Sequence, residues 1–194
     1  MTVYCGTSNL GKLREFRLAA PHFEIIPVDA PPPEEYGTTF FEETAREKAL
    51  YYGGFTRGWV FADDSGLEVD ALGGAPGVYS ARFAGPNATD AQTNALLLEK
   101  LRGVENRTAH FVCMIALVRD GELVNTFRGM VEGRIADEPR GANGFGYDPL
   151  FFYEPFGCTF GEAALDGKMR ASHRGQALRA MFAFLDSGRS RSSS

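Results

Sequence analysis

The chain has 194 residues, of which 44% are hydrophobic and 23% are charged, a composition close to that of ordinary globular proteins. This length fits one domain, or one body with two lobes, and allows a sizeable core. The formal net charge of −5 excludes the basic surface expected of a protein that binds a nucleic-acid duplex or an anionic membrane, so a polyanionic ligand would need a local basic pocket.

Short strands and helices alternate in the first third of the chain. Three apolar runs bounded by turn residues are predicted as strands: residues 3–6, 22–28 and 59–62. Two helices are predicted between them: residues 12–20 and 41–52. Pro31-Pro32-Pro33 excludes regular structure after the second strand, and the third strand is expected to end at Asp63 and Asp64.

The rest of the chain adds a helix, a long hairpin and a final helix. Thr89 or Asp90 is expected to cap a helix whose apolar residues lie on one face. Asp120-Gly121 is a hairpin-turn signal between two strand-like runs, residues 110–119 and 123–135. Ser172 is expected to cap the last helix. We therefore predict an α/β fold with a mixed sheet and a long antiparallel hairpin in the middle of the chain.

The cysteines and the chain ends bear on the compartment. Cys5, Cys113 and Cys158 form neither a CxxC pair nor a zinc-ligand spacing, so we expect reduced core thiols in a cytoplasmic protein. The first residues lack the pattern of a signal peptide, and no apolar run approaches the roughly 18 residues needed to cross a membrane. Residues 188–194 are expected to form a disordered polar tail after a single domain of residues 1–187.

Residues 6–13, GTSNLGKL, nearly match the phosphate-binding P-loop, G-x-x-x-x-G-K-[ST]. Leu13 stands where that motif requires a hydroxyl that holds Mg²⁺, so a P-loop mechanism is disfavoured. The segment still predicts a strand, a polar turn of Thr7, Ser8 and Asn9, and a helix start whose N–H groups and Lys12 face an anion. A capped turn without a ligand is the alternative from these residues alone.

Asp63 and Asp64 are adjacent carboxylates at the end of a predicted buried strand. Because neighbouring strand residues face opposite ways, one of them can coordinate an ion while the other orients or activates water. The alternative is an exposed turn, for which Asp-Asp-Ser-Gly is also suited. Glu42 and Glu43, at the start of the preceding helix, can supply a further ligand or be ordinary first-turn acids, and Lys48 can reach a phosphate or remain solvated.

Two late segments combine residue types that suit a nucleotide. Residues 143–149, NGFGYDP, place Phe145 and Tyr147 between glycines, which suits a ring-stacking platform; a glycine-rich hairpin end is the alternative. His173 and Arg174 occupy the first turn of the predicted last helix, where cations oppose the helix dipole. Their placement there indicates an anionic or acceptor-rich partner.

Five segments lie in an order that resembles one family. They are TSNLGK (7–12), the F-x-E…K-A helix start (41–49), ADDSGLEVDALGGAPGVYSARFAG (62–85), NGFGYDPLF (143–151) and SHRGQAL (172–178). Together they resemble the inosine triphosphate pyrophosphatase family, over nearly the whole chain. The resemblance implies hydrolysis of ITP, dITP and XTP to the monophosphate and pyrophosphate, which keeps deaminated purines out of DNA and RNA. It also implies Mg²⁺ as cofactor, a homodimer, and an elongated mixed sheet with two lobes around a nucleotide cleft.

The resemblance further implies roles for individual residues. Asp64 is expected to accept a proton and, with Glu43, to bind Mg²⁺. Residues 7–12 are expected to hold the triphosphate, and the later residues to bind the nucleotide and read its base. The full set of expected substrate contacts is Thr7, Ser8, Asn9, Leu10, Gly11, Lys12, Lys48, Ser65, Phe145, Gly146, Tyr147, Asp148, Lys168, His173 and Arg174.

One departure from the family pattern concerns the metal-binding glutamate. The family has T-F-x-E-N-A-x-x-K-A, whereas TFFEETAREKA has one residue more between Thr39 and Lys48. Counting forward from Thr39 selects Glu42, and counting back from Lys48 selects Glu43. The helical spacing to Lys48 favours Glu43, and Glu42 remains the alternative. Two other functions also remain as hypotheses: a P-loop NTPase, and a nucleotide-binding sensor without turnover.

Overall fold

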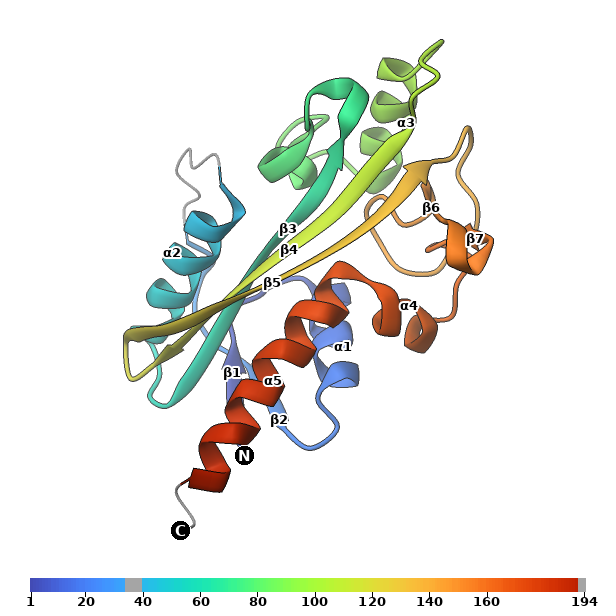
Figure 1. Ribbon diagram of the computed structural model, residues 1–194. Helices are drawn as coiled ribbons and strands as arrows, with labels where there is room; N and C mark the ends of the chain where they lie inside the picture. The colour runs from blue at the N-terminus through green and yellow to red at the C-terminus, as the bar shows by residue number, and fades with distance from the viewer. Residues whose placement is uncertain (34–39, 192–194) are drawn as a thin grey trace. The chain divides into compact units, whose positions relative to one another are not determined.

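The computed structural model describes residues 1–33 and 40–191, with side chains to residue 188 (Figure 1). These residues form two compact units. The first unit comprises Met1–Asp64, Cys113–Gly129 and the chain from His173 onward, and the second comprises Ser65–Val112 and Met130–Ser172. Among the described residues, no helix is both long enough and apolar enough to cross a membrane.

Seven strands form one mixed sheet in the order β2-β1-β3-β4-β5-β6-β7. Their bounds are β1 Thr2–Cys5, β2 Glu24–Pro27, β3 Trp59–Val69, β4 Thr108–Arg119, β5 Glu122–Ile135, β6 Phe151–Tyr153 and β7 Cys158–Thr159. β1 pairs in parallel with β2 and β3, whereas β6 pairs antiparallel with β5 and β7. The predicted α/β class with a mixed sheet is confirmed; β7 was not predicted.

Strand β3 does not end at Asp63-Asp64, so that prediction was wrong. The strand continues through both carboxylates to Val69. Asp-Asp-Ser-Gly is locally suited to a turn, but each carboxylate meets a lysine, Lys12 for Asp63 and Lys48 for Asp64. These partners offset the cost of burying the two charges, and the segment can therefore remain extended inside the sheet.

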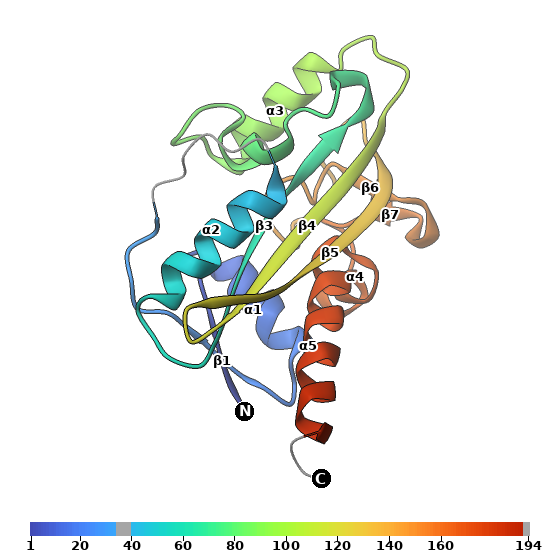
Figure 2. The same ribbon diagram turned by 60° about the vertical axis from the view of Figure 1, so that its left-hand side comes forward.

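Three helices belong to the first unit: α1 Leu10–Ala19, α2 Phe41–Gly53 and α5 His173–Arg191. α1 and α5 lie side by side on one face of the strands, where Phe61 of β3 contacts Phe16 of α1 and Phe182 of α5 (Figure 1). α2 lies on the other face, with Gly53 against Val118 of β4 (Figure 2). α5 includes residues 188–191, which the sequence assigned to a polar tail; residues 192–194 lie outside the described part.

The second unit has its own hydrophobic core. α3, Asp90–Lys100, has Thr89 as its N-cap in a capping box with Gln92, so of the two predicted caps Thr89 is confirmed and Asp90 is the first residue of the helix. α4, Leu165–Ala171, was not predicted, and neither were the short 3₁₀ turns η1 Asp70–Leu72, η2 Gly77–Arg82 and η3 Glu154–Phe156. The core comprises Leu67, Val69, Leu97, Leu101, Ala109, Phe111, Val131, Ile135, Tyr147, Leu150, Phe151 and Phe160. The core includes Ile135, the last residue of β5, and Phe151, the first residue of β6. Both ends of the loop between these strands are therefore anchored in the core.

All three cysteines are free thiols. Cys5 and Cys113 are buried, as the sequence predicts, whereas Cys158 is only partly buried. Burial raises the pKa of the Cys5 thiol to about 12, so this group is a neutral part of the core at physiological pH.

Candidate active site

The turn after β1 is built by its own polar side chains. Thr7 Oγ1 accepts a hydrogen bond from the backbone N–H of Asn9 at 3.1 Å, and Asn9 Oδ1 accepts one from the N–H of Lys12 at 3.0 Å. Asn9 is therefore the N-cap of α1. The N–H groups of Leu10 and Gly11 donate to no acceptor among the described residues, so the first turn of α1 retains two donors that suit an anion.

The glycine at the start of this turn is needed for packing. A Cβ on Gly6 would collide with the ring of Tyr52 in α2, so only glycine allows the two elements to approach this closely. In the P-loop reading, Gly6 was the first glycine of a phosphate cradle. The close packing against Tyr52 explains why this position requires glycine even though the segment is not a P-loop.

Asp63 is the centre of a buried ion network in the first unit. Its Oδ1 accepts a hydrogen bond from Lys12 Nζ at 3.0 Å, and its Oδ2 accepts one from Arg174 Nε at 3.1 Å. Arg174 Nη1 donates to Glu15 Oε2 at 2.5 Å. Two cations thus meet two carboxylates, all buried except for the partly exposed Lys12, and the formal charges cancel.

The electrostatic effect of this network on Asp63 is strong. Burial alone would raise the pKa of Asp63, but the charges of Lys12 and Arg174 outweigh it and hold that pKa well below its usual range. For Arg174, burial lowers the pKa, and the carboxylates of Glu15 and Asp63 more than reverse that effect. Asp63 is therefore a permanently ionised anchor for Lys12 and Arg174.

Asp64 has the opposite environment, because alternation along β3 turns it away from Asp63 toward α2. Its Oδ1 accepts a hydrogen bond from Lys48 Nζ at 3.2 Å. Burial raises its pKa, although Lys48 and Lys12 act against that change. Its Oδ2 is buried and has no hydrogen-bond partner among the described residues. Two adjacent carboxylates with pKa values shifted in opposite directions are typical of a catalytic site.

The unpartnered oxygen of Asp64 fits a divalent cation, which takes carboxylate oxygens as ligands. Within the described residues, no three acidic, histidine or cysteine side chains are already arranged as a complete metal site. Glu42 forms an ion pair with Arg46 at 2.5 Å and accepts a hydrogen bond from Thr126 Oγ1 at 3.3 Å. Glu43 is exposed and makes no hydrogen bond or ion pair within the described part of the chain. Thr39, from which one of the two counts started, lies outside that part.

The second unit contains the glycine-rich loop. Asp148 Oδ2 accepts a hydrogen bond from the N–H of Phe145 at 2.9 Å and another from Lys168 Nζ at 2.6 Å. Lys168 is 2% exposed, and its ammonium lies 5.1 Å from the centre of the Phe145 ring. Within this unit the structure therefore brings together three of the predicted substrate contacts, Phe145, Asp148 and Lys168.

The remaining predicted residues differ in exposure. Tyr147 is buried and donates from its hydroxyl to the backbone oxygen of Ser80 at 2.8 Å; burial is the main cause that raises its pKa. Tyr147 is therefore an anchor of the loop rather than an open stacking surface. His173 is buried at the start of α5, Ser65 is partly buried in β3, and Ser8 is exposed.

Sequence reasoning missed three residues that hold these groups in place. Glu15 was not singled out, although a carboxylate beside the apolar Phe16 on α1 is a weak signal of a buried ion pair. Asp90 was considered only as a helix cap, and Asn94 was not considered. Both contact the backbone of Gly146, 52 to 56 residues further along the chain.

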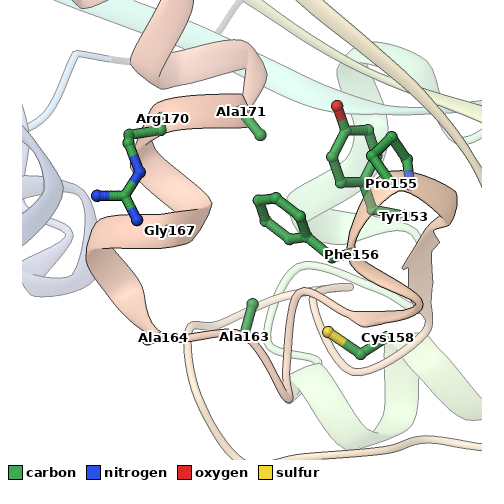
Figure 3. Close-up of a pocket in the computed structure, with 9 residues that line it drawn as sticks. All are labelled: Tyr153, Pro155, Phe156, Cys158, Ala163, Ala164, Gly167, Arg170 and Ala171. Atoms are coloured by element: carbon green, nitrogen blue, oxygen red, sulfur yellow. The ribbon is translucent and has the colours of Figure 1, made fainter.

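A separate pocket in the second unit contains none of the predicted site residues. It has a volume of about 700 Å³ and lies between α4 and the segment around η3 (Figure 3). Its wall consists of Tyr153, Pro155, Phe156, Cys158, Ala163, Ala164, Gly167, Arg170 and Ala171. Figure 3 shows the guanidinium group of Arg170 directed away from the aromatic side chains on the opposite wall.

Comparisons with known proteins identify the family of this chain. The model of the Ham1 family matches residues 3–184. A dITP/XTP pyrophosphatase of Exiguobacterium sp. AT1b is 50% identical over 188 residues, which cover 92% of this chain and 94% of that protein. A dITP/XTP pyrophosphatase of Acidobacterium capsulatum is 47% identical, with coverage of 95% and 98%.

Solved structures of Ham1 proteins are also similar to this chain. The structure of a HAM1 protein from Coxiella burnetii has a TM-score of 0.86 and 38% identity, and the match covers 96% of this chain and 99% of that one. The Staphylococcus aureus Ham1 protein has a TM-score of 0.85 and 38% identity, with coverage of 97% and 100%. The resemblance found in the sequence is therefore confirmed along nearly the whole chain.

Proposed function

Because the chain belongs to the Ham1 family, we propose that it hydrolyses deaminated purine nucleoside triphosphates, ITP, dITP and XTP, to the monophosphate and pyrophosphate. Removal of these nucleotides keeps them out of DNA and RNA. The observation that carries the proposal is the contrast between two adjacent carboxylates. Asp63 is neutralised by Lys12 and Arg174, whereas Asp64 keeps a buried oxygen that has no hydrogen-bond partner in the described part of the chain.

In the proposed reaction, residues of the first unit act on the triphosphate. The N–H groups of Leu10 and Gly11, with Lys12 and Lys48, balance the charge of the phosphates. Asp64 accepts the proton of the water that attacks the phosphorus, and the pyrophosphate leaves with the electron pair of the broken P–O bond. Asp64 and Glu43 would hold Mg²⁺, which, when bound, neutralises phosphate charge.

Base selection is assigned to donors that meet the 6-oxo group of hypoxanthine or xanthine. Lys168, His173 and Arg174 carry such donors. Adenine presents an amino group at the same position, so a donor of the site loses its partner, which costs on the order of 1–3 kcal/mol per group. Phe145 to Asp148 complete the proposed set of nucleotide contacts. Guanine shares the 6-oxo group and must be rejected at its 2-position.

The activity is tested by incubating the purified protein with ITP, dITP, XTP and ATP and separating pyrophosphate from orthophosphate. The expected products are pyrophosphate and the monophosphate, with ATP the poorest substrate. Orthophosphate release or a preference for ATP contradicts the proposal. A gain of activity in Leu13→Thr would instead support a P-loop NTPase, and ITP binding without turnover would support a sensor.

His173→Ala is expected to reduce the preference for ITP over ATP. The variant lacks one donor to the 6-oxo group of ITP. The preference for ITP over ATP should therefore fall about tenfold or more, which corresponds to the cost of one unpaired polar group. The measurement is the ratio of kcat/KM for the two nucleotides at saturating Mg²⁺. An unchanged ratio removes His173 from base recognition.

Glu43→Gln is expected to raise the Mg²⁺ concentration needed for half-maximal activity by about tenfold or more. Glu42→Gln is the matched control, because Glu42 is engaged by Arg46 and Thr126 and its loss should leave this concentration nearly unchanged. Mg²⁺ titration by calorimetry provides a readout that does not depend on turnover. If Glu42→Gln shows the larger effect, Glu42 is the ligand.

We also propose that the protein is a homodimer and that it acts in the cytoplasm, where the nucleotide pool lies. Both follow from the family resemblance. Light scattering coupled to size-exclusion chromatography measures the mass in solution, and a value near the chain mass of 21.2 kDa contradicts the dimer.

A further inference from the structure

Two side chains of helix α3 form hydrogen bonds with the backbone of Gly146, one with its N–H group and one with its carbonyl oxygen. The N–H of Gly146 donates to Asp90 Oδ2 at 2.6 Å, and the carbonyl oxygen of Gly146 accepts from Asn94 Nδ2 at 3.0 Å. Asp90 and Asn94 are four residues apart on α3, so their side chains project from the same face of the helix. All three residues belong to the second unit.

These two hydrogen bonds fix more than one peptide. The N–H of Gly146 belongs to the peptide plane before its Cα, and its carbonyl oxygen belongs to the plane after it. The two bonds together therefore restrain both φ and ψ at this residue. Gly146 has φ 61°, in the left-handed region, where glycine is also the residue with the most conformational freedom to lose. A restraint at this position therefore constrains the path of the loop.

The rest of the loop is already attached to the second unit. Tyr147 is anchored through its hydroxyl to Ser80, and Asp148 is bonded to Lys168 and to the N–H of Phe145. Gly146 connects Phe145 to Tyr147 and Asp148, and its conformation therefore sets where Phe145 lies relative to these two residues. The helix that restrains it is itself fixed, because its N-terminus has a capping box and Leu97 and Leu101 lie in the core.

The environment of Asn94 is unusual for a residue without a specific role. Its side chain is buried, and its Oδ1 has no hydrogen-bond donor among the described residues. A buried amide with one unmet acceptor is costly, so an apolar side chain would suit stability better at this position. Within the described part of the chain, the side-chain amide of Asn94 donates to the carbonyl oxygen of Gly146.

We propose that Asp90 and Asn94 are positioning residues that set the conformation of the nucleotide-binding loop, residues 145–148, and thereby the KM for the nucleotide. The inference rests on the proposed function, in which this loop contacts the nucleotide. Neither side chain needs to touch the substrate. Their effect passes through the two peptide planes of Gly146 to Phe145 on one side and to Asp148 on the other.

The test is steady-state kinetics with ITP on Asp90→Ala, Asp90→Asn and Asn94→Ala. Asp90→Ala and Asn94→Ala are expected to raise KM about tenfold while kcat stays within about twofold, because the loop binds the nucleotide but takes no part in bond cleavage. Asp90→Asn keeps an acceptor oxygen, so its KM should lie between those of Asp90→Ala and the unchanged protein.

Thr89→Ala is the matched control. It removes the cap of α3 and lowers stability but leaves both contacts to Gly146 in place, so its KM should not change. If KM rises equally in Thr89→Ala, or is unchanged in Asp90→Ala and Asn94→Ala, the inference is wrong. Phe145→Ala separates this inference from the proposed function. If KM rises in Phe145→Ala but not in the α3 variants, only the positioning role is wrong. If KM is unchanged in Phe145→Ala, the proposed contact of Phe145 with the nucleotide is wrong.

Discussion

Asp64→Asn is expected to lower kcat for ITP by about 10²- to 10⁴-fold, the range that a general base contributes, while the protein stays at least as stable. Asn is nearly isosteric with Asp, so packing in β3 is kept. Burial raises the pKa of Asp64, which means that its charged form is disfavoured in the folded protein. A neutral side chain at this position therefore relieves a cost and removes the proton acceptor. The measurements are pyrophosphate release at saturating ITP and Mg²⁺, and thermal unfolding without ligand.

Asp63→Asn is the matched control, because it makes the same chemical change one residue away. Here the carboxylate is the anchor of Lys12 and Arg174, so the variant leaves buried positive charge with too few acceptors. Loss of one partner of a buried ion pair costs about 3–5 kcal/mol, so the thermal midpoint should fall clearly. Equal destabilisation of the two variants, or a kcat near that of the unchanged protein in Asp64→Asn, contradicts the assignment of the two carboxylates.

Local signals in the sequence were sufficient where a few neighbouring residues determine the structure. Thr89 and Asp90 both suit a cap, and α3 does begin there, with Thr89 as the N-cap, because a helix cap depends on residues only a few positions apart. Asp120-Gly121 joins two neighbouring strands of the sheet, and both residues have the positive φ that a two-residue hairpin turn requires. In each case the stabilising contacts lie within a short stretch of the chain.

Local signals failed where distant residues decide the outcome. Asp63 and Asp64 were expected to end a strand, because the cations that permit their burial lie elsewhere in the chain, Lys12 being 51 residues away. Glu15 could not be assigned for the same reason, since its partner Arg174 is 159 residues away. The residue types of the proposed site were recognised through the family resemblance, but the residues that orient them depend on contacts that only the folded chain brings together.

The largest effect on stability is expected from disturbing the pair formed by Glu15 and Arg174. Both side chains are almost fully buried, at 2% and 3% exposure, and Arg174 joins Glu15 to Asp63. Glu15→Leu removes one of the two carboxylates that Arg174 contacts, and Arg174→Met removes the guanidinium group that Glu15 contacts. Each single variant should lower the free energy of unfolding by about 3–5 kcal/mol.

The double variant Glu15→Leu/Arg174→Met is expected to be more stable than either single one. Two apolar side chains of similar volume then replace the pair, and Asp63 keeps Lys12 as its partner. Urea unfolding of the four proteins gives the coupling between the two sites, and Asp166→Asn, in an exposed pair with Arg170, is the control, with an expected change of about 0.5 kcal/mol or less. Additive losses in the double variant would mean that Glu15 and Arg174 contribute through packing rather than as a charge pair. Recovery in the double variant would instead mean that an apolar pair serves the fold as well as the buried ion pair does.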